Sequence, residues 1–433
     1  MPDMPERHIK VGILGCGIVG GGTYQILSGN ADEIARRVGA PVTVTAIADI
    51  DWDREREFDV PPGIRTTDGA AVCADPDIDI VVETIGGVGI AKDLVMAAIM
   101  HGKSVVTSNK ELMAKFGDEI LDAAREKRVD VEFEGAVGGV IPIIRSLKES
   151  LEAGKIQRIV GIVNGTTNYI LTKMSQEGLQ FADVLAQAQE LGYAEQDPTA
   201  DVDGIDSQNK IAILAAIAFG HRVNVQDVYR EGISRISPID IEYARRMGYV
   251  VKLLAVAGLC NGEIELRVHP AFVPNDHPLA SVSGVFNAIF VQGEACGDVM
   301  LYGKGAGDMP TGSAVAGDII DCARNILRGA QGRVPCTCEG QSSVRSIDEV
   351  VAKTYVRMRI KDRPGVLGSI ATILGQEGVS IESVIQEANV GEDLAEIVWV
   401  MHPCPRKLLT SALGAIGSLR IVDSIPGIIP VEE

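Results

Sequence analysis

The stretch richest in reactive side chains is Leu191–Lys210, which carries five carboxylates and ends on a lysine. The apolar segment Ile211–Gly220 follows directly. It is too short to cross a bilayer and too hydrophobic for a solvent-facing helix. We therefore expect a buried helix with a charged N-terminal end. Asp203 is its expected N-cap, with Asp206 at the N3 position of a capping-box-like start.

Lys210 is the candidate proton donor of this stretch. It lies four residues after Asp206, so the two side chains share one face of the expected helix. An ammonium group near a helix N-terminus opposes the helix dipole, and burial also favours its neutral form. Such a lysine suits proton donation to a reacting group. The alternative is a capped core helix with a surface ion pair, and this stretch alone leaves both interpretations open.

Size and charge limit the classes of protein that this chain can belong to. Its 433 residues are enough for two or three domains, each with its own core. The net charge of −19 argues against nucleic-acid binding. There is no run of about twenty apolar residues, as a membrane span would need, and the polar N-terminus does not resemble a signal peptide. We expect a cytoplasmic protein.

The eight cysteines are scattered, and only Cys336 and Cys338 lie close together. No histidine cluster stands near this pair, so zinc is not expected. Free thiols are the default expectation in the cytosol.

A glycine-rich turn follows the first predicted strand, His8–Leu14. Its spacing is the GxGxxG of dinucleotide-binding turns, in which glycines allow a pyrophosphate to approach the backbone at a helix N-terminus. The motif alone is weak evidence, but its position after a strand strengthens it. The residues of the turn are Gly15, Cys16, Gly17, Ile18, Val19 and Gly20.

Asp49 follows the second predicted strand, Val42–Ala48. An acid at this place usually binds the adenosine ribose and favours NAD, although the separation from the glycines exceeds the usual distance of about 20 residues. Arg54 lies close enough downstream to pair with the 2′-phosphate of NADP instead. The choice of cofactor stays open, with a slight preference for NAD. Asp49 could also be an ordinary turn residue at a strand end.

Further polar residues follow two apolar strands, Ile78–Glu83 and Ser104–Val106. Open parallel sheets bind ligands at the carboxyl ends of their strands. Lys110, soon after the second of these strands, could therefore meet the nicotinamide or the substrate. The alternative for Lys110 is an ordinary lysine at the start of a helix.

Two glycine clusters lie farther along the chain. The first follows the expected strand Val129–Ala136 and precedes the expected helix Ile143–Ala153. Its exposed carbonyls, together with Glu134, could hold a monovalent cation. The second precedes the expected helix Thr311–Leu327. There Gly307 could allow close approach to the cofactor, or simply tight helix packing.

The remaining segments give the domain order. The residues 164–169 are expected to form a loop before the helix Ile170–Gln176. Periodicity disappears across Arg328–Glu349, which predicts a linker. From Thr354 onward, the expected βαββαβ order over roughly eighty residues predicts a small ferredoxin-like module.

Several of these motifs resemble those of homoserine dehydrogenases. FEGAVGGVIPII, NGTTNYILTKM and LGYAEQDPTADVDGIDSQNK occur in the same order and with similar spacing, and GCGIVGGG and TSNK fit as well. The last eighty residues, with DRPGVLG, resemble an ACT domain, an amino-acid-binding regulatory module. The resemblance covers nearly the whole chain.

The fold class that the resemblance implies is α/β, with a Rossmann-type dinucleotide-binding domain at 1–140 and an α+β catalytic and dimerisation domain at 141–328. A linker at 329–350 and a ferredoxin-like ACT domain at 351–433 would follow. The last helix of the catalytic domain, at about 305–328, would pack back on the nucleotide domain.

The resemblance also implies the activity, an NAD(P)-linked interconversion of L-homoserine and L-aspartate 4-semialdehyde on the route to threonine, methionine and isoleucine. Lys210 would be the catalytic acid/base, and Lys110 would sit between substrate and nicotinamide. A threonine-like effector would bind the ACT domain, in a dimer or tetramer. The implied substrate ligands are Gly192, Glu195 and Asp206. The implied sodium ligands are Glu134, Val137, Gly139 and Ile141. The implied cofactor-lining residues are Gly17, Ile18, Val19, Thr84, Ser108 and Gly307.

One departure and two alternatives accompany this resemblance. Many bacterial relatives carry an arginine at the position of Ala48, and its absence here puts a preference for NADP in doubt. A non-catalytic amino-acid sensor on a nucleotide-binding fold is one alternative, against which both Lys110 and Lys210 argue. The other is a phosphorylating semialdehyde dehydrogenase, which needs an activated cysteine that no motif here suggests.

Overall fold

The computed structural model describes residues 7–334, 338, 340, 343–391 and 393–432. By its internal contacts the chain forms two units. The first unit comprises Met1–Ile159, Asn209–Gln226 and Asn287–Ser342; the second comprises Val160–Gln208, Asp227–Phe286 and Ser343–Glu433. The domain boundaries expected from the sequence stay a prediction. Among the described residues, no helix combines the length and apolar character needed to cross a membrane.

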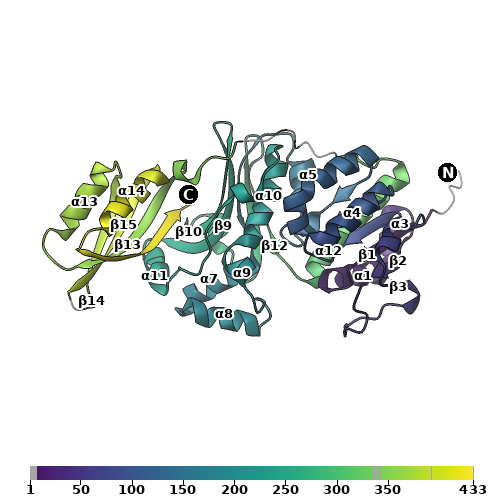
Figure 1. Cartoon of the computed structure of the whole chain (residues 1–433), viewed down its shortest axis with the longest axis horizontal. Coiled ribbons are helices and arrows are strands. Elements are labelled where there is room, and N and C mark those ends of the chain that lie inside the picture. The colour runs from purple at the N-terminus through teal and green to yellow at the C-terminus, as the bar shows by residue number, and fades with distance from the viewer. Residues whose placement is uncertain (1–6, 335–337, 339, 341–342, 392, 433) are drawn as a thin grey trace. The chain divides into compact units, whose positions relative to one another are not determined.

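A parallel sheet with the order β3-β2-β1-β4-β5-β6 forms the centre of the first unit (Figure 1). This is the strand order of Rossmann folds, whose ligands bind at the point where the order reverses, between β1 and β4. The strands are β1 (Ile9–Leu14), β2 (Val42–Ala48), β3 (Arg65–Thr66), β4 (Ile80–Glu83), β5 (Ser104–Thr107) and β6 (Val131–Glu132).

Apolar residues of β1 and β2 pack against α1 and α12 in one core of this unit. A Cβ atom at Gly22 of α1 would lie 2.4 Å from the carbonyl oxygen of Asp308, so the two helices meet at a position where only glycine fits. Helices and turns of this unit include α1 (Ile18–Gly29), α2 (Ala31–Val38), α3 (Gly69–Ala74), α4 (Gly89–Met100), α5 (Lys110–Lys127), α6 (Ile143–Arg145) and α12 (Asp308–Arg328). The strands β11 (Phe286–Gly293) and β12 (Gly297–Lys304) are neighbours.

Strands of the second unit form a mixed sheet with the order β9-β10-β16-β13-β15-β14, and β8 also pairs with β10. The strands are β8 (Tyr229–Arg230), β9 (Tyr249–Cys260), β10 (Glu263–Pro274), β13 (Val351–Lys361), β14 (Ile381–Gly391), β15 (Leu394–Pro405) and β16 (Val422–Val431). The helices are α7 (Gly165–Glu177), α8 (Phe181–Glu190), α9 (Thr199–Val202), α11 (Pro238–Arg246), α13 (Val366–Gln376) and α14 (Arg406–Gly417).

The C-terminal module, β13 to β16 with α13 and α14, has the expected βαββαβ order. Its two helices lie beside β13 and β15 (Figure 1). Trp399 of β15 is fully buried in the core that they form. The last strand, β16, is also joined to β10 in parallel, with Val431 opposite Phe272. The module therefore continues the sheet of the second unit.

Three local expectations from the sequence are wrong. The expected strand 129–136 is only two residues long, because the chain turns into a 3-10 turn at Glu134–Ala136. The expected helix 143–153 is a single α turn, followed by a π turn at Ser146–Ser150. The expected loop 164–169 is mostly helix, because the side chain of Asn164 accepts a hydrogen bond from the Thr167 N–H and caps α7.

Asp203 is not the N-cap of the charged helix. It is the C-cap residue of α9, and Gly204, with a φ of +79°, turns the chain before α10 (Ile205–Phe219) begins. Asp206 is therefore the second residue of α10 rather than the third. A carboxylate in this first turn still interacts favourably with the helix dipole.

Candidate active site

The glycine turn after β1 is built for close approach of backbone groups. Gly15 has a φ of +93°, and a Cβ atom at this residue would lie 2.9 Å from the carbonyl oxygen of Thr84. A Cβ atom at Gly20 would lie 2.0 Å from the Gly15 carbonyl oxygen, so neither position has room for a side chain. The hydroxyl of Thr84 donates to this same oxygen at 2.9 Å and joins the ends of β1 and β4.

Gly17, the N-cap of α1, differs from these two glycines. A Cβ atom there would meet no other atom within 4 Å, so the space in front of the helix N-terminus is open. The first helical residue, Ile18, is 66% exposed, and Val19 is half-buried. This geometry suits a phosphate group at the helix N-terminus.

Asp49 is fixed at the end of β2 by its own neighbours. Its carboxylate accepts the Cys16 N–H at 2.6 Å and the Asp51 N–H at 2.9 Å. The Arg56 guanidinium lies 3.5 Å from the same carboxylate and donates to the Cys16 carbonyl at 3.2 Å. The arginine at this edge of the glycine turn is therefore Arg56, whereas the sequence had suggested Arg54.

Residues that sequence reasoning missed hold the ends of β4 and β5. The buried carboxylate of Glu83 accepts the Thr107 hydroxyl at 2.6 Å and the Ile85 N–H at 2.8 Å. Asn109 caps α5 and donates to the Gly87 carbonyl at 2.6 Å. Lys110 is consequently the first residue of α5, half-buried at a fixed place beyond the strand end.

Two more expected cofactor residues lie in the first unit. Ser108 packs beside Gly135, where a Cβ atom would lie 3.1 Å from that of Ser108. Gly307 is the N-cap of α12 and has a φ of +128°, which a side chain would strain.

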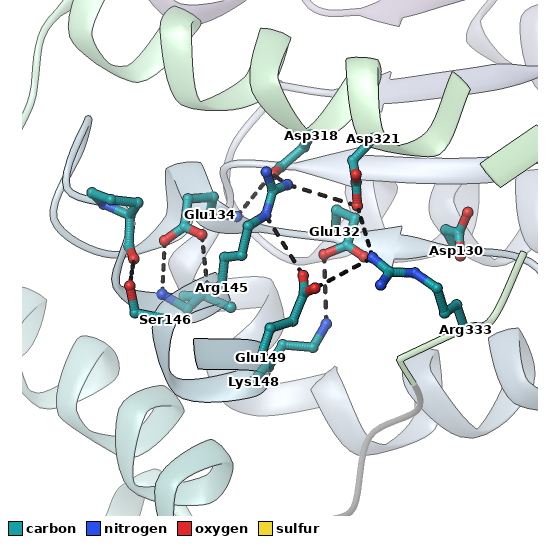
Figure 2. Close-up of polar contacts among 12 residues, drawn as sticks. Asp130, Glu132, Glu134, Arg145, Ser146, Lys148, Glu149, Asp318, Asp321 and Arg333 are labelled. Atoms are coloured by element: carbon teal, nitrogen blue, oxygen red, sulfur yellow. Dashed lines mark hydrogen bonds and ion pairs between the residues drawn. The ribbon is translucent and has the colours of Figure 1, made fainter. Parts of the chain in front are cut away.

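Glu134 lies in a network of buried charges (Figure 2). Its carboxylate accepts the N–H groups of Ile144 and Arg145, at 2.7 and 2.8 Å, and so caps the turn of α6. Burial raises the pKa of Glu134, and the two N–H donors oppose this rise. Its own N–H donates to the carboxylate of Asp318, whose pKa burial raises well above the usual range. Arg145 extends to Asp318 at 3.2 Å.

The glycine turn after Glu134 leaves backbone carbonyls available. Gly138 and Gly139 both have positive φ, and Gly139 lies so close to the end of β12 that a Cβ atom would be 2.6 Å from the Lys304 carbonyl oxygen. Within the described part of the chain, the carbonyls of Val137 and Gly139 accept no hydrogen bond, although both residues are buried. Such carbonyls suit a hard cation. The Ile141 carbonyl accepts the Ile143 N–H at 2.8 Å.

In the second unit, Asn164 forms hydrogen bonds with two of the carboxylates of the charged stretch. Its side-chain amide donates to Asp201 at 2.7 Å and to Asp206 at 2.9 Å. Asp206 is only 4% exposed. Sequence reasoning assigned no role to Asp201 and did not single out Asn164. A signal was present, because an asparagine followed by a helical stretch is a common N-cap pattern.

The other expected substrate residues lie on a loop that contacts the start of α7. Gly192 and Glu195 are exposed on the loop after α8. This loop is held by the Thr166 hydroxyl, which donates to the Tyr193 carbonyl at 2.7 Å, and by Gln189, which donates to the Glu195 carbonyl at 3.1 Å.

Lys210 is 7% exposed, on α10, one turn after Asp206. Both side chains are thus buried at the start of the same helix. They therefore do not form the surface ion pair that was the alternative interpretation of this stretch. A carboxylate suits a substrate ammonium group, and a lysine suits proton transfer to an oxygen.

Family models match three parts of the chain. They are the homoserine dehydrogenase NAD-binding domain at 15–134, homoserine dehydrogenase at 142–320 and the ACT domain at 354–413.

Similar proteins match nearly the full chain. The homoserine dehydrogenase of Neisseria gonorrhoeae is 44% identical, covering 96% of this chain and 97% of its own length. That of Synechocystis is 45% identical, with coverage of 98% and 99%.

Solved structures agree. A homoserine dehydrogenase from Thiobacillus denitrificans has a TM-score of 0.94 at 42% identity, with 99% of both chains covered. A hyperthermophilic archaeal homoserine dehydrogenase in complex with NADPH has a TM-score of 0.62 at 29% identity and covers 74% of this chain and 98% of its own. The chain therefore belongs to the homoserine dehydrogenase family, in the form that carries a C-terminal ACT domain.

Proposed function

We propose that the protein interconverts L-homoserine and L-aspartate 4-semialdehyde, in the cytoplasm, on the route to threonine, methionine and isoleucine. The observation that carries this proposal is the buried start of α10, where Asp206, held by Asn164, precedes the buried Lys210 by one turn.

The nicotinamide cofactor supplies the hydride when bound. Lys210 gives a proton to the oxygen on which negative charge develops, and takes one back in the reverse direction. The carboxylate of Asp206 binds the ammonium group of the substrate. Glu195 and the backbone at Gly192 also bind the substrate. Lys110 orients the substrate beside the nicotinamide from the start of α5.

The cofactor would lie along the glycine turn, with its pyrophosphate at Gly17, Ile18 and Val19, and with Thr84, Ser108 and Gly307 lining it. The open space at Gly17 supports this placement. Asp49 would bind the adenosine ribose, which favours NAD. The nearby guanidinium of Arg56 provides a partner for a 2′-phosphate, so NADP also fits.

A sodium ion would be held by Glu134 and by the carbonyls of Val137, Gly139 and Ile141. The two buried carbonyls without hydrogen bonds support this assignment. Replacing sodium by choline in the assay should lower the rate, and Glu134→Gln should weaken the dependence on sodium. A rate that does not depend on the monovalent cation would contradict this part.

The C-terminal module would bind a product amino acid and reduce the activity. Threonine is the first candidate. The protein would act as a homodimer or homotetramer, since symmetric assemblies are usual for enzymes of this kind. The domain boundaries at 140, 328 and 350 belong to the same proposal.

The test is the consumption of NADH and NADPH with aspartate semialdehyde. Lys210→Met keeps the length of the side chain and removes the ammonium, and we expect the rate to fall by about 10²–10⁴-fold. Lys173→Met, at a partly exposed lysine that pairs with Glu177, serves as the control and should keep the parent rate. The mechanism would be refuted by an unchanged rate in Lys210→Met. It would also be refuted if the parent consumed no cofactor, which is the result expected of a non-catalytic sensor.

A further inference from the structure

Asn287, the second residue of β11, has a buried side-chain amide that no group in the described part of the chain satisfies. The residue is 1% exposed, and neither its Nδ2 nor its Oδ1 has a hydrogen-bond partner among the described residues. Native proteins pair nearly all of their buried amides with protein groups, ordered water or an ion. An unpaired buried amide lowers stability, so packing alone does not account for an asparagine at this position.

The amide lies against the backbone of Gly305, in the segment that joins β12 to α12. A Cβ atom at Gly305 would lie 2.0 Å from Nδ2 and 2.5 Å from Oδ1 of Asn287, so only glycine leaves room for the amide. Gly305 also meets the glycine turn that follows Glu134, since a Cβ atom at Gly139 would lie 2.8 Å from the Gly305 carbonyl oxygen. The backbone of Gly305 therefore contacts both the amide and the turn.

Asn287 also faces this turn. Side chains two residues apart on a strand lie on the same face, so Ile289 shares a face of β11 with Asn287. The Cδ1 atom of Ile289 lies 3.5 Å from the position of a Cβ atom at Gly138. The face of β11 that carries the amide is thus covered by the turn. There the carbonyls of Val137 and Gly139 accept no hydrogen bond within the described part of the chain.

The oxygens gathered here suit a cation of low charge. An amide oxygen and backbone carbonyl oxygens are neutral ligands that hard cations take in proteins. The carboxylate of Glu134, at the start of the same turn, adds one negative charge and already accepts two N–H groups (Figure 2). One carboxylate among neutral oxygens balances a singly charged ion better than a divalent one. A monovalent cation is therefore the partner whose chemistry fits Asn287.

We propose that Asn287 is a further ligand of the monovalent cation and that it links this ion to the cofactor. Its Oδ1 binds the ion, which fixes the amide and with it the backbone at Gly305. Two residues later, Gly307 is the N-cap of α12 and is expected to line the cofactor. The inference rests on the proposed function, because it uses the cation site and the cofactor placement given there.

The ion and the cofactor should therefore help one another to bind. The experiment compares the full-length protein in sodium chloride and in choline chloride at the same ionic strength. In the parent, sodium should raise the melting temperature, as a ligand of the folded state does. It should also lower the Kd of NADPH, measured by the fluorescence of the reduced nicotinamide, by about fivefold or more. Because coupling is reciprocal, NADPH should lower the half-saturating sodium concentration by the same factor. Neither measurement needs turnover.

Asn287→Leu is the decisive variant, because it keeps the size of the side chain and removes its polar atoms. In choline its melting temperature should not fall, since an apolar group of the same shape can replace an unpaired amide without loss. In sodium it should lose both the rise in melting temperature and the shift in the Kd of NADPH. A purely structural asparagine would leave both sodium effects unchanged.

Two more variants complete the test. Asn287→Asp keeps an oxygen ligand and adds a negative charge, so it should lower the half-saturating sodium concentration by about fivefold or more. Gln292→Leu, at the far end of β11, where the side chain donates to Asp298 at 3.2 Å, is the control and should behave as the parent.

Three results would overturn the inference. The first is an Asn287→Leu variant that keeps the sodium effects of the parent. The second is a parent whose affinity for NADPH does not depend on sodium. The third is an Asn287→Asp variant with the sodium response of the parent, a result that counts even if Asn287→Leu does not fold.

Failure of this inference can be told from failure of the proposed function. A parent that reduces aspartate semialdehyde but binds NADPH equally well in sodium and in choline would keep the function and lose the link. A parent that shows the linkage and its loss in Asn287→Leu, but consumes no cofactor with this substrate, would keep the link and lose the function.

Discussion

The side-chain amide of Asn164 donates a hydrogen bond to the carboxylate of Asp206 at 2.9 Å, and both residues are buried. Asn164 also donates to Asp201 and caps α7. One amide thus fixes the start of one helix and the orientation of the acid in the first turn of another. If Asp206 binds the substrate, Asn164 is a positioning residue for the reaction.

Asn164→Ser should separate these two roles. Serine remains a good N-cap, so the melting temperature should change little, but its short side chain cannot reach both carboxylates. We expect kcat/KM for homoserine to fall about tenfold to hundredfold, since positioning errors of this kind are costly. Asn164→Ala should show the same kinetic loss together with lower stability. Parent-like kinetics in both variants would show that the bond to Asp206 does not matter for the reaction.

Gly17 and Gly20 should respond differently to the same change. In Gly17→Ala the new methyl group meets no other atom, so the fold should persist while cofactor binding weakens by at least about tenfold. In Gly20→Ala it would lie 2.0 Å from the Gly15 carbonyl oxygen, so stability itself should fall. Cofactor titration and thermal unfolding of both variants check this. Parent-like cofactor affinity in Gly17→Ala would place the pyrophosphate elsewhere.

Asp49→Asn should change the cofactor preference. The variant keeps a hydrogen-bonding side chain at the end of β2 but removes the charge that disfavours a 2′-phosphate, and Arg56 remains beside it. We expect the ratio of kcat/KM for NADH to that for NADPH to fall by about tenfold. Asp51→Asn, at an exposed neighbour, is the control. An unchanged ratio, or a parent that strongly prefers NADPH, would contradict the assignment of Asp49 to the ribose.

Lys252 should make stability depend on alkaline pH. Burial lowers the pKa of this lysine to about 8, and its ammonium donates to Asn168 at 3.1 Å. Between this pKa and the ordinary value, the unfolded chain binds the proton more tightly than the folded chain. The cost of burying the charge is therefore full below pH 8 and is relieved as the pH rises.

Lys252→Met removes this titration. The free energy of unfolding of the parent, relative to that of the variant, should rise by about 2 kcal/mol between about pH 7.5 and pH 9.5. The hydrogen bonds lost in the variant add a constant that does not vary with pH. Urea unfolding at several pH values measures the difference, and a difference that stays flat would show that Lys252 does not titrate in this range.

Local patterns were enough to predict the nucleotide-binding fold. The alternation of apolar strands with a glycine turn identified β1 and β2, because each of these signals lies within a few residues. The C-terminal βαββαβ order was visible for the same reason. The charged start of α10 was also recognisable, although its exact beginning was not, since the left-handed turn at Gly204 ends α9 first.

Interactions between distant residues could not be predicted. Asn164 is 37 residues from Asp201 and 42 from Asp206, and no spacing rule links them. Glu134 breaks its expected strand because its carboxylate is recruited to cap α6, about ten residues later. The carboxylate of Glu83 accepts a hydrogen bond from Thr107, which lies on another strand.

The pairing of β10 with β16 also constrains how the chain can fold during synthesis. β10 is complete by Pro274, yet its partner Val431 is translated more than a hundred residues later. Until then, that part of the β10 edge presents unpaired backbone groups, a surface to which other chains can add a strand. The second unit should thus reach its final structure only after translation of β16.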